Sequence, residues 1–155
     1  WRPLRCFIVA VLGGAGSGSH HTIGRMKNRS CPFCAPQQPR VLFGDEVAFA
    51  YRDGHPVSPG HTLIIPRRHV GSWFELTLDE RDAMLRLLDA ARDAVVAEFH
   101  PDGFNLGIND GPAAGQTGAH VHLHVIPRYQ GDTADPRGGV RWVIPAKADY
   151  WSRPR

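Results

Sequence analysis

The sequence predicts one α+β domain, in which an antiparallel sheet carries a single long helix packed on one face. Three observations point to this fold class. Short β-branched and aromatic runs bounded by turn residues lie in both halves of the chain, one segment of helical periodicity separates them, and no internal repeat interrupts this order. A chain of 155 residues with 42% hydrophobic residues is also apolar enough to bury one core.

Five short segments have the pattern of strands. The first two flank a Gly-Asp turn, so we expect them to form a hairpin. The third and the fifth each end in proline, which cannot donate a hydrogen bond to a strand ladder. Before the first strand, the Pro-rich run CPFCAPQQPR predicts a loop or a short knuckle. The expected strands are residues 40–43, 46–51, 61–66, 104–110 and 120–127.

The helix has the clearest boundaries. Thr77 and Glu80 have the spacing of a capping box, in which each side chain bonds the backbone N–H of the other residue. An apolar stripe then recurs every three or four residues until Pro101 ends the helix. The stripe, which we expect to face the core, consists of Met84, Leu88, Ala91, Val95 and Phe99.

Charge divides the chain into unequal parts. Residues 1–30 contain five basic residues and no acidic one, and we expect a disordered or non-native N-terminal extension there. Of 18 basic and 15 acidic residues in all, 13 and 15 remain in residues 31–155, a net charge of −2. The pI near 9.0 therefore reflects the extension and gives little support for a nucleic-acid surface, so we expect no nucleic-acid partner. We expect a folded domain over 31–135 and a tail over 136–155, for which the pattern predicts no structure.

The cysteines indicate the compartment and a metal site. Cys6, Cys31 and Cys34 are too few for a secreted disulfide framework, and we expect a cytoplasmic protein. No stretch reaches the roughly 20 apolar residues that span a bilayer, so we expect no membrane partner. The motif CPFC is compatible with a redox pair or with half of a metal site, and we favour the metal site.

The segment HVHLHV carries three histidines at alternate positions. On a strand, His120, His122 and His124 project together from one face, and the apolar residues between them point to the core. A solvated face and a catalytic metal site of three imidazoles plus water are the alternatives. We favour a phosphate-handling active site in which His122 is the nucleophile.

The Gly-rich loop GPAAGQTG, residues 111–118, directly precedes these histidines. Its glycines allow backbone N–H groups to approach an anion closely, and Gln116 and Thr117 add side-chain donors. Alone, such a loop is most often a flexible turn. Beside aligned histidines it favours phosphoryl transfer, because its donors stabilise the charge that gathers on phosphate oxygens in the transition state.

Taken together, these motifs resemble the histidine triad (HIT) family. Residues 120–126 match the family signature His-φ-His-φ-His-φ-φ, in which φ is apolar. A second block, DGHPVSPGHTLIIPRRH, is similar to the nucleotide-binding half of the family, and the likeness extends from about Cys31 to Pro127. The resemblance implies a HIT-like fold and a purine nucleotide as substrate.

The resemblance also implies the roles of individual residues. His122 would attack the α-phosphorus and form a covalent nucleotidyl-histidine that water hydrolyses, while His124 would contact the phosphate or the leaving group. His61 would support the pocket of the nucleophile. The implied nucleotide-binding residues are Asp53 at the ribose hydroxyls, Asn109 on the phosphate side, and Gly115, Gln116 and Thr117 at the phosphate and the leaving group.

A structural zinc site follows from the same resemblance. Many bacterial family members bind zinc through two cysteines and two histidines, and the matching positions here are Cys31, Cys34, His69 and His120. Such a set is closed and tetrahedral, which suits structure rather than catalysis. His120 would then serve both the metal site and the active site. For His69, a surface histidine is the alternative, and some members lack zinc.

The sequence thus favours a nucleotide hydrolase or transferase that cleaves at the α-phosphate, such as the nucleoside phosphoramidases of the Hint-like branch. Cleavage of diadenosine polyphosphates by hydrolysis or phosphorolysis is the second hypothesis, and a non-catalytic nucleotide-binding module is the third. A redox or DNA-repair role rests on CPFC alone. Hint-like members pair through the long helix, which implies a homodimer.

Two positions lie outside the core match. Trp142, in the segment GGVRWVIP, resembles a residue in the tail of some family members; we expect it near the site or a partner subunit, or as a packing residue. Gly118 stands where relatives often carry bulkier residues, so we expect a looser approach to the last strand.

Overall fold

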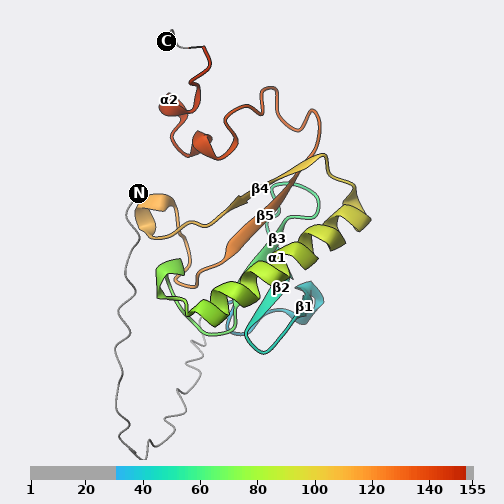
Figure 1. Ribbon diagram of the computed structural model, residues 1–155, viewed down its shortest axis with the longest axis vertical. Coiled ribbons are helices and arrows are strands. Elements are labelled where there is room, and N and C mark those ends of the chain that lie inside the picture. Colours follow the sequence, from blue (N-terminus) through green and yellow to red (C-terminus); the bar gives the residue numbers. More distant parts are fainter. Residues whose placement is uncertain (1–30, 153–155) are drawn as a thin grey trace, which may run out of the picture.

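The computed structural model describes residues 31–152, and the expectation for residues 1–30 lies outside the described residues. Five strands form one antiparallel sheet in the order β1-β2-β3-β5-β4, and one long helix crosses it (Figure 1). The elements are β1 Val41–Gly44, β2 Ala48–Arg52, β3 Thr62–Pro66, α1 Leu78–Phe99, β4 Gly103–Gly107 and β5 Leu123–Arg128. Short helical turns are η1 Gln38–Arg40, η2 Trp73–Glu75, η3 Pro112–Ala114, η4 Gly139–Val143 and α2 Pro145–Ala148. The predicted α+β architecture is confirmed.

The two faces of the sheet differ in what covers them. One face packs against α1, and the other carries a smaller apolar cluster. The core beneath α1 consists of Ala48, Ala50, Ile64, Val70, Leu76, Ala83, Met84, Ala91, Val121, Leu123 and Val125. The second cluster consists of Phe49, Tyr51, Leu63 and Ile65, flanked by Phe33 and Val41. Because His124 pairs directly with Leu63, its side chain lies on the second face, away from α1.

The capping box at the start of α1 is formed as predicted. The Thr77 hydroxyl accepts from the Glu80 N–H at 3.2 Å, and the Glu80 carboxylate accepts from the Thr77 N–H at 2.9 Å. The Arg68 guanidinium also bonds this carboxylate at 2.7 and 2.8 Å, and it lowers the pKa of Glu80. The helix start is therefore tied to the loop that follows β3.

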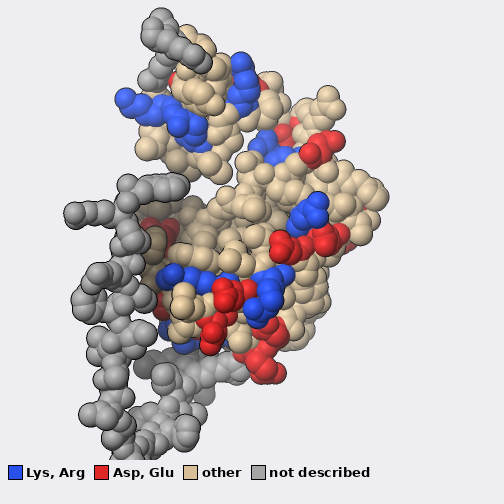
Figure 2. All heavy atoms as spheres, in the orientation of Figure 1, with Lys and Arg blue, Asp and Glu red and all other residues tan. Residues whose placement is uncertain are grey.

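At its other end, α1 stops where the sequence predicts. His100 adopts a left-handed conformation with φ 51°, and its N–H donates to Val96 O at 3.2 Å, just before Pro101. Of the predicted stripe, Met84, Ala91 and Val95 are fully buried, whereas Leu88 and Phe99 are only partly buried. On the α1 face shown in Figure 2, basic and acidic side chains lie next to each other.

Two predicted strands are shorter than expected. β5 begins at Leu123, so His120 and His122 precede the strand instead of lying in it. The Val121 N–H donates to Val70 O at 2.8 Å, in the loop after β3, rather than to a strand of the sheet. β4 ends at Gly107 rather than at residue 110, because β5 offers it no partner before Leu123.

The tail forms a small lobe beyond the sheet, next to the β4 edge (Figure 1). Within the lobe, the Arg137 guanidinium lies 4.7 Å from the Trp151 ring centre. The Trp142 indole N–H donates to Arg137 O at 2.8 Å, and this side chain is 45% exposed. Trp142 thus packs within its own lobe. Among the residues described, 31–152, no helix is long and apolar enough to cross a membrane.

Candidate active site

The site is built on the sheet face opposite α1, where β3 and β5 lie side by side. His61 enters from the turn before β3, and Gly60 in that turn has φ +83°. A Cβ at Gly60 would lie 2.9 Å from the Phe99 ring, so only glycine lets the turn come this close to the end of α1. This close approach sets the position of His61, which is 3% exposed.

His122 is held by the chain just before it. Its Nδ1 lies 3.0 Å from the carbonyl oxygen of His120, which can only accept, so Nδ1 carries the proton. In the neutral ring, Nε2 then has a free lone pair, and within residues 31–152 no side chain or backbone group bonds it. The ring packs edge-on to His124 at 4.7 Å and beside Phe33 at 5.2 Å between ring centres. This arrangement presents a nucleophilic nitrogen.

His124 belongs to a line of three polar side chains. Its Nδ1 is 3.1 Å from Nε2 of His61, and Nδ1 of His61 is 3.4 Å from the carboxylate of Asp53. Burial lowers the pKa of His124 to about 4, with smaller contributions from the neighbouring His122 and His61. Burial also lowers the pKa of His61, although the Asp53 carboxylate opposes this shift. Both rings are therefore neutral near pH 7.

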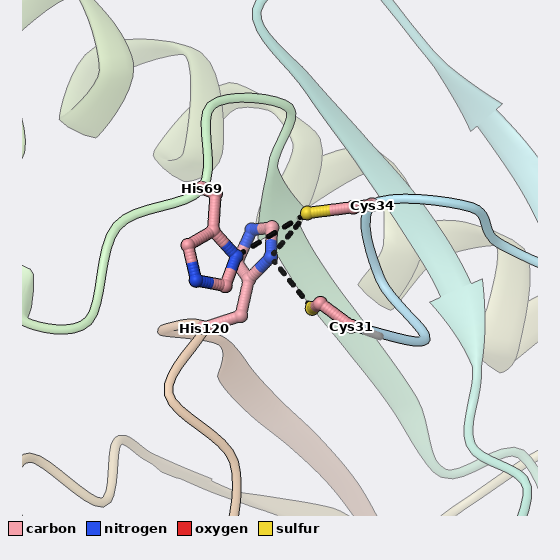
Figure 3. Close-up of side chains that lie close together, drawn as sticks. All are labelled: Cys31, Cys34, His69 and His120. Carbon is pink, nitrogen blue, oxygen red and sulfur yellow. Dashed lines mark hydrogen bonds between the residues drawn. The ribbon is translucent and has the colours of Figure 1, made fainter. Parts of the chain in front are cut away.

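The first histidine of the motif faces a different group. Cys31, Cys34, His69 and His120 come together with their ligand atoms within 4.8 Å of one another (Figure 3). They come from the loop before β1, the loop after β3 and the segment before β5. The Sγ atoms of Cys31 and Cys34 lie 3.4 and 3.7 Å from His120 Nδ1, and Cys34 Sγ lies 3.2 Å from His69 Nδ1. The four residues predicted for zinc are thus neighbours.

The donor set fits a metal of this type. Around tetrahedral zinc, with Zn–S about 2.3 Å and Zn–N about 2.0 Å, sulfur–nitrogen edges measure roughly 3.5 Å. The observed separations of 3.2 to 3.7 Å bracket that length. His120 Nε2 donates to Pro66 O at 2.8 Å, so its Nδ1 lone pair faces the cysteines. Burial lowers the pKa of His120 to about 4, which keeps the ring neutral.

This geometry separates the three motif histidines. His120 turns toward the cysteines, His122 bonds the backbone and His124 turns toward His61. Within residues 31–152 they do not converge on one point, as the alternative of a three-histidine metal site requires. The expectation that all three project from one strand face is not met, because His120 and His122 precede β5, and His120 is 1% exposed.

The Gly-rich loop has the conformation that its glycines suggest. Gly111 and Gly115 have φ values of +87° and +86°, which other residues rarely adopt. Gln116 is engaged at both ends of its amide: its oxygen accepts from the Gly111 N–H, and its nitrogen donates to Gly71 O, each at 2.7 Å. Gln116 and Thr117 line a surface cavity of about 400 Å³, and Thr117 is exposed.

Three further residues were singled out from the sequence: Asn109, Gly118 and Asp53. Asn109 is half-buried in the segment between β4 and the Gly-rich loop. A Cβ added at Gly118 would meet nothing within 4 Å, which agrees with a loose approach to β5. Asp53 is 17% exposed; its second oxygen accepts from the His55 N–H at 2.8 Å.

Sequence reasoning missed two residues that shape the site. The Phe33 ring lies between His122 and Tyr51, at 5.2 and 6.1 Å, and forms an aromatic wall. The only sequence signal was an aromatic residue inside CPFC. Asp110 accepts from the Ser72 hydroxyl at 3.0 Å and from the Trp73 N–H at 2.7 Å, which ties the Gly-rich loop to the loop after β3. No local pattern marks such a contact.

Comparison with known proteins agrees with this site. The sequence profile of the HIT domain family matches residues 36–131. The chain belongs to the HIT family. Its predicted HIT-like fold also has counterparts among solved structures: a Zn-bound histidine triad family protein from Mycobacterium smegmatis superposes with a TM-score of 0.61 at 33% identity, covering 77% of this chain and 94% of that protein.

Two curated HIT relatives carry enzyme names. The bis(5′-adenosyl)-triphosphatase of Dictyostelium discoideum is 38% identical over 96 residues, which are 62% of this chain and 64% of that protein. The adenylylsulfatase HINT3 of Arabidopsis thaliana is 34% identical over 128 residues, which are 80% and 65%. This chain therefore spans just under two thirds of both relatives.

Proposed function

We propose that the protein is a nucleotide hydrolase or transferase that cleaves at the α-phosphate of a purine nucleotide through a covalent intermediate on His122. One observation carries the proposal. The hydrogen bond from His122 Nδ1 to the carbonyl of His120 leaves Nε2 with its lone pair free beside His124. The enzyme names of the two HIT relatives agree with this reaction class.

The chemistry needs two displacements. In the first, the lone pair of His122 Nε2 forms a bond to the α-phosphorus, and the bond from phosphorus to the leaving group breaks with its electron pair, which takes up a proton from water. In the second, a water oxygen bonds to phosphorus and gives up a proton, the P–N bond breaks, and the electron pair returns to Nε2. Negative charge that gathers on the phosphate oxygens in each transition state must be met by N–H and O–H donors of the site.

We assign the donors to the Gly-rich loop that leads into His120. The Gly111 N–H is bonded to the Gln116 side chain and the Gly115 N–H to Pro112 O, so a phosphate would have to displace these bonds, whereas the exposed Thr117 offers its hydroxyl directly. Gln116 supports this loop through its bonds to Gly111 and Gly71, and its second amide hydrogen is available to a phosphate oxygen. Asn109 and Asp53 are assigned to the phosphate side and the ribose by family resemblance.

A substrate panel tests the activity and its branch. Adenosine phosphoramidate, diadenosine triphosphate and tetraphosphate, with and without inorganic phosphate, would be compared by kcat/KM. We expect adenosine phosphoramidate to be preferred, as in a Hint-like phosphoramidase. Preference for a dinucleotide would support the second hypothesis. If the protein binds AMP but turns over none of these substrates, the result would contradict the proposed activity and favour a non-catalytic nucleotide-binding module.

The covalent step has its own test. Rapid acid quench during turnover, followed by mass spectrometry of the peptide that contains His122, should find one nucleotidyl group on that peptide. The same modification on His124, or none under conditions of steady turnover, would contradict the assignment of the nucleophile.

We also propose that Cys31, Cys34, His69 and His120 hold a structural zinc ion, as their donor chemistry and separations support. Two thiols opposite histidines, rather than a disulfide, agree with a reducing compartment such as the cytoplasm. Zinc analysis of protein purified without added metal tests the site, and less than a tenth of an equivalent per chain would contradict it.

A homodimer through α1 is the proposed assembly. Besides its buried stripe, α1 carries a second apolar stripe, Leu78, Leu85 and Val96, which are 74%, 47% and 37% exposed. Spacings of 7 and 11 residues place these three on one line of the helix surface. Sedimentation of the wild type and of Leu85→Glu tests the pairing: we expect a dimer and a monomer, and a monomeric wild type would contradict it.

A further inference from the structure

The line from Asp53 through His61 to His124 has a feature that the proposed covalent chemistry does not use. His61 lies in the middle and is 3% exposed, so solvent hardly screens its neighbours. Its two ring nitrogens face different groups: Nε2 is 3.1 Å from His124 Nδ1, and Nδ1 is 3.4 Å from Asp53 Oδ2. A neutral imidazole has one N–H and one lone pair, so its tautomer decides the direction of both contacts.

Two arrangements compete. In the first, His61 Nδ1 carries the proton toward Asp53, and His61 Nε2 accepts from the Nδ1–H of His124. In the second, His61 Nδ1 accepts from the Val57 N–H, 3.4 Å away, and His61 Nε2 donates to His124. The second arrangement places the Nδ1 lone pair opposite an anionic carboxylate. Charge therefore favours the first arrangement.

The direction matters at the far end of the line. In the first arrangement the remaining nitrogen of His124, Nε2, is a lone pair; in the second it is an N–H. His124 is neutral near pH 7, because burial lowers its pKa to about 4. Its tautomer, rather than its charge, therefore decides whether it accepts or donates a proton beside His122.

We propose that Asp53 is a positioning residue that, through His61, holds Nε2 of His124 as a proton acceptor. The inference rests on the proposed function and concerns its second displacement. There the water O–H bond breaks and its proton bonds to His124 Nε2, while the water oxygen bonds to phosphorus and the P–N bond to His122 breaks. His124 then carries two N–H groups, and its charge is balanced by the Asp53 carboxylate at the other end of the line.

Ring-nitrogen NMR of the full chain without nucleotide tests the direction. Long-range ¹H–¹⁵N spectra distinguish protonated from unprotonated ring nitrogens. In the wild type we expect His124 with a proton on Nδ1 and none on Nε2. In Asp53→Asn, whose amide can donate to His61 Nδ1, we expect the reverse. Asp102→Asn is the matched control, since Asp102 accepts from the Gln130 N–H outside this line. A wild-type proton on Nε2 would overturn the proposal even if no variant folds.

Kinetics separate this role from ribose binding, which the family resemblance also gives to Asp53. We expect Asp53→Asn to lower kcat by at least about tenfold, with ribose and with 2′,3′-dideoxyribose substrates alike. If the loss disappears with the dideoxy substrate, Asp53 acts on the ribose alone and the proposal is wrong. Failure of the proposed function is distinct, because the wild type would then turn over no substrate while its NMR spectrum still reported the direction.

Discussion

His120 and His124, four residues apart, lie in contrasting surroundings. His120 is 1% exposed, and both of its ring nitrogens are occupied, one by Pro66 O and one by the cysteines. Within residues 31–152, His124 is bonded through Nδ1 alone, and its ring is partly exposed. An imidazole held at both nitrogens is part of the structure, whereas one held at a single nitrogen is oriented and still reactive. His122 belongs with His124 by this criterion.

The largest effect on activity should come from removing His122, the proposed nucleophile. We expect His122→Ala to lower kcat by at least about a thousandfold while AMP binding, measured by calorimetry, changes little. His55→Ala, an exposed histidine in the turn before β3, is the control and should keep the wild-type rate. Substantial turnover by His122→Ala would contradict the proposal that His122 differs from His120 in taking part in the reaction.

Loss of a cysteine should instead affect stability. We expect Cys34→Ser to lose bound metal and on the order of 4 kcal/mol of unfolding free energy, because lost metal sites are among the largest single-mutation effects. The folded fraction should lose far less kcat than His122→Ala. Denaturant titration and metal analysis measure both quantities. Unchanged stability together with a full loss of activity would contradict a structural role for the group that contains His120.

The pH dependence of stability sharpens the difference at His124. Its pKa falls from 6.5 in the unfolded chain to about 4 in the folded protein, because the ring is buried. The unfolded state therefore binds a proton first as the pH falls, and stability should be lost progressively between pH 6.5 and pH 4. His124→Asn should show a smaller loss over this window. An identical slope in the two proteins would contradict the burial of His124.

The smallest effect should come from Thr77, which contacts neither the group around His120 nor that around His124. Thr77→Ala removes the helix cap and should cost about 1 kcal/mol of unfolding free energy without altering kcat. Thr77→Ser keeps the hydroxyl and should retain most of that stability. A change of kcat in Thr77→Ala alone would mean that the α1 start, through Glu80 and Arg68, reaches the active site.

The sequence by itself determined the features that depend on neighbouring residues. The capping box needs only Thr77 and Glu80, three residues apart, and the period of two around Val121 and Leu123 is visible without any partner. The HIT motif, the fold class and the helix boundaries were all predictable for this reason.

Tertiary structure decided which ring nitrogen meets which partner. His120 contacts Pro66 from 54 residues away and Cys31 from 89 residues away, and these contacts turn its ring away from His122 and His124. The same long-range packing starts β5 at Leu123 rather than at His120. The alternation of histidines predicts on which side of a strand each ring lies. The groups that bond each ring nitrogen come from distant parts of the chain. Only the folded chain could therefore separate a histidine bonded at both ring nitrogens from two that are bonded at one.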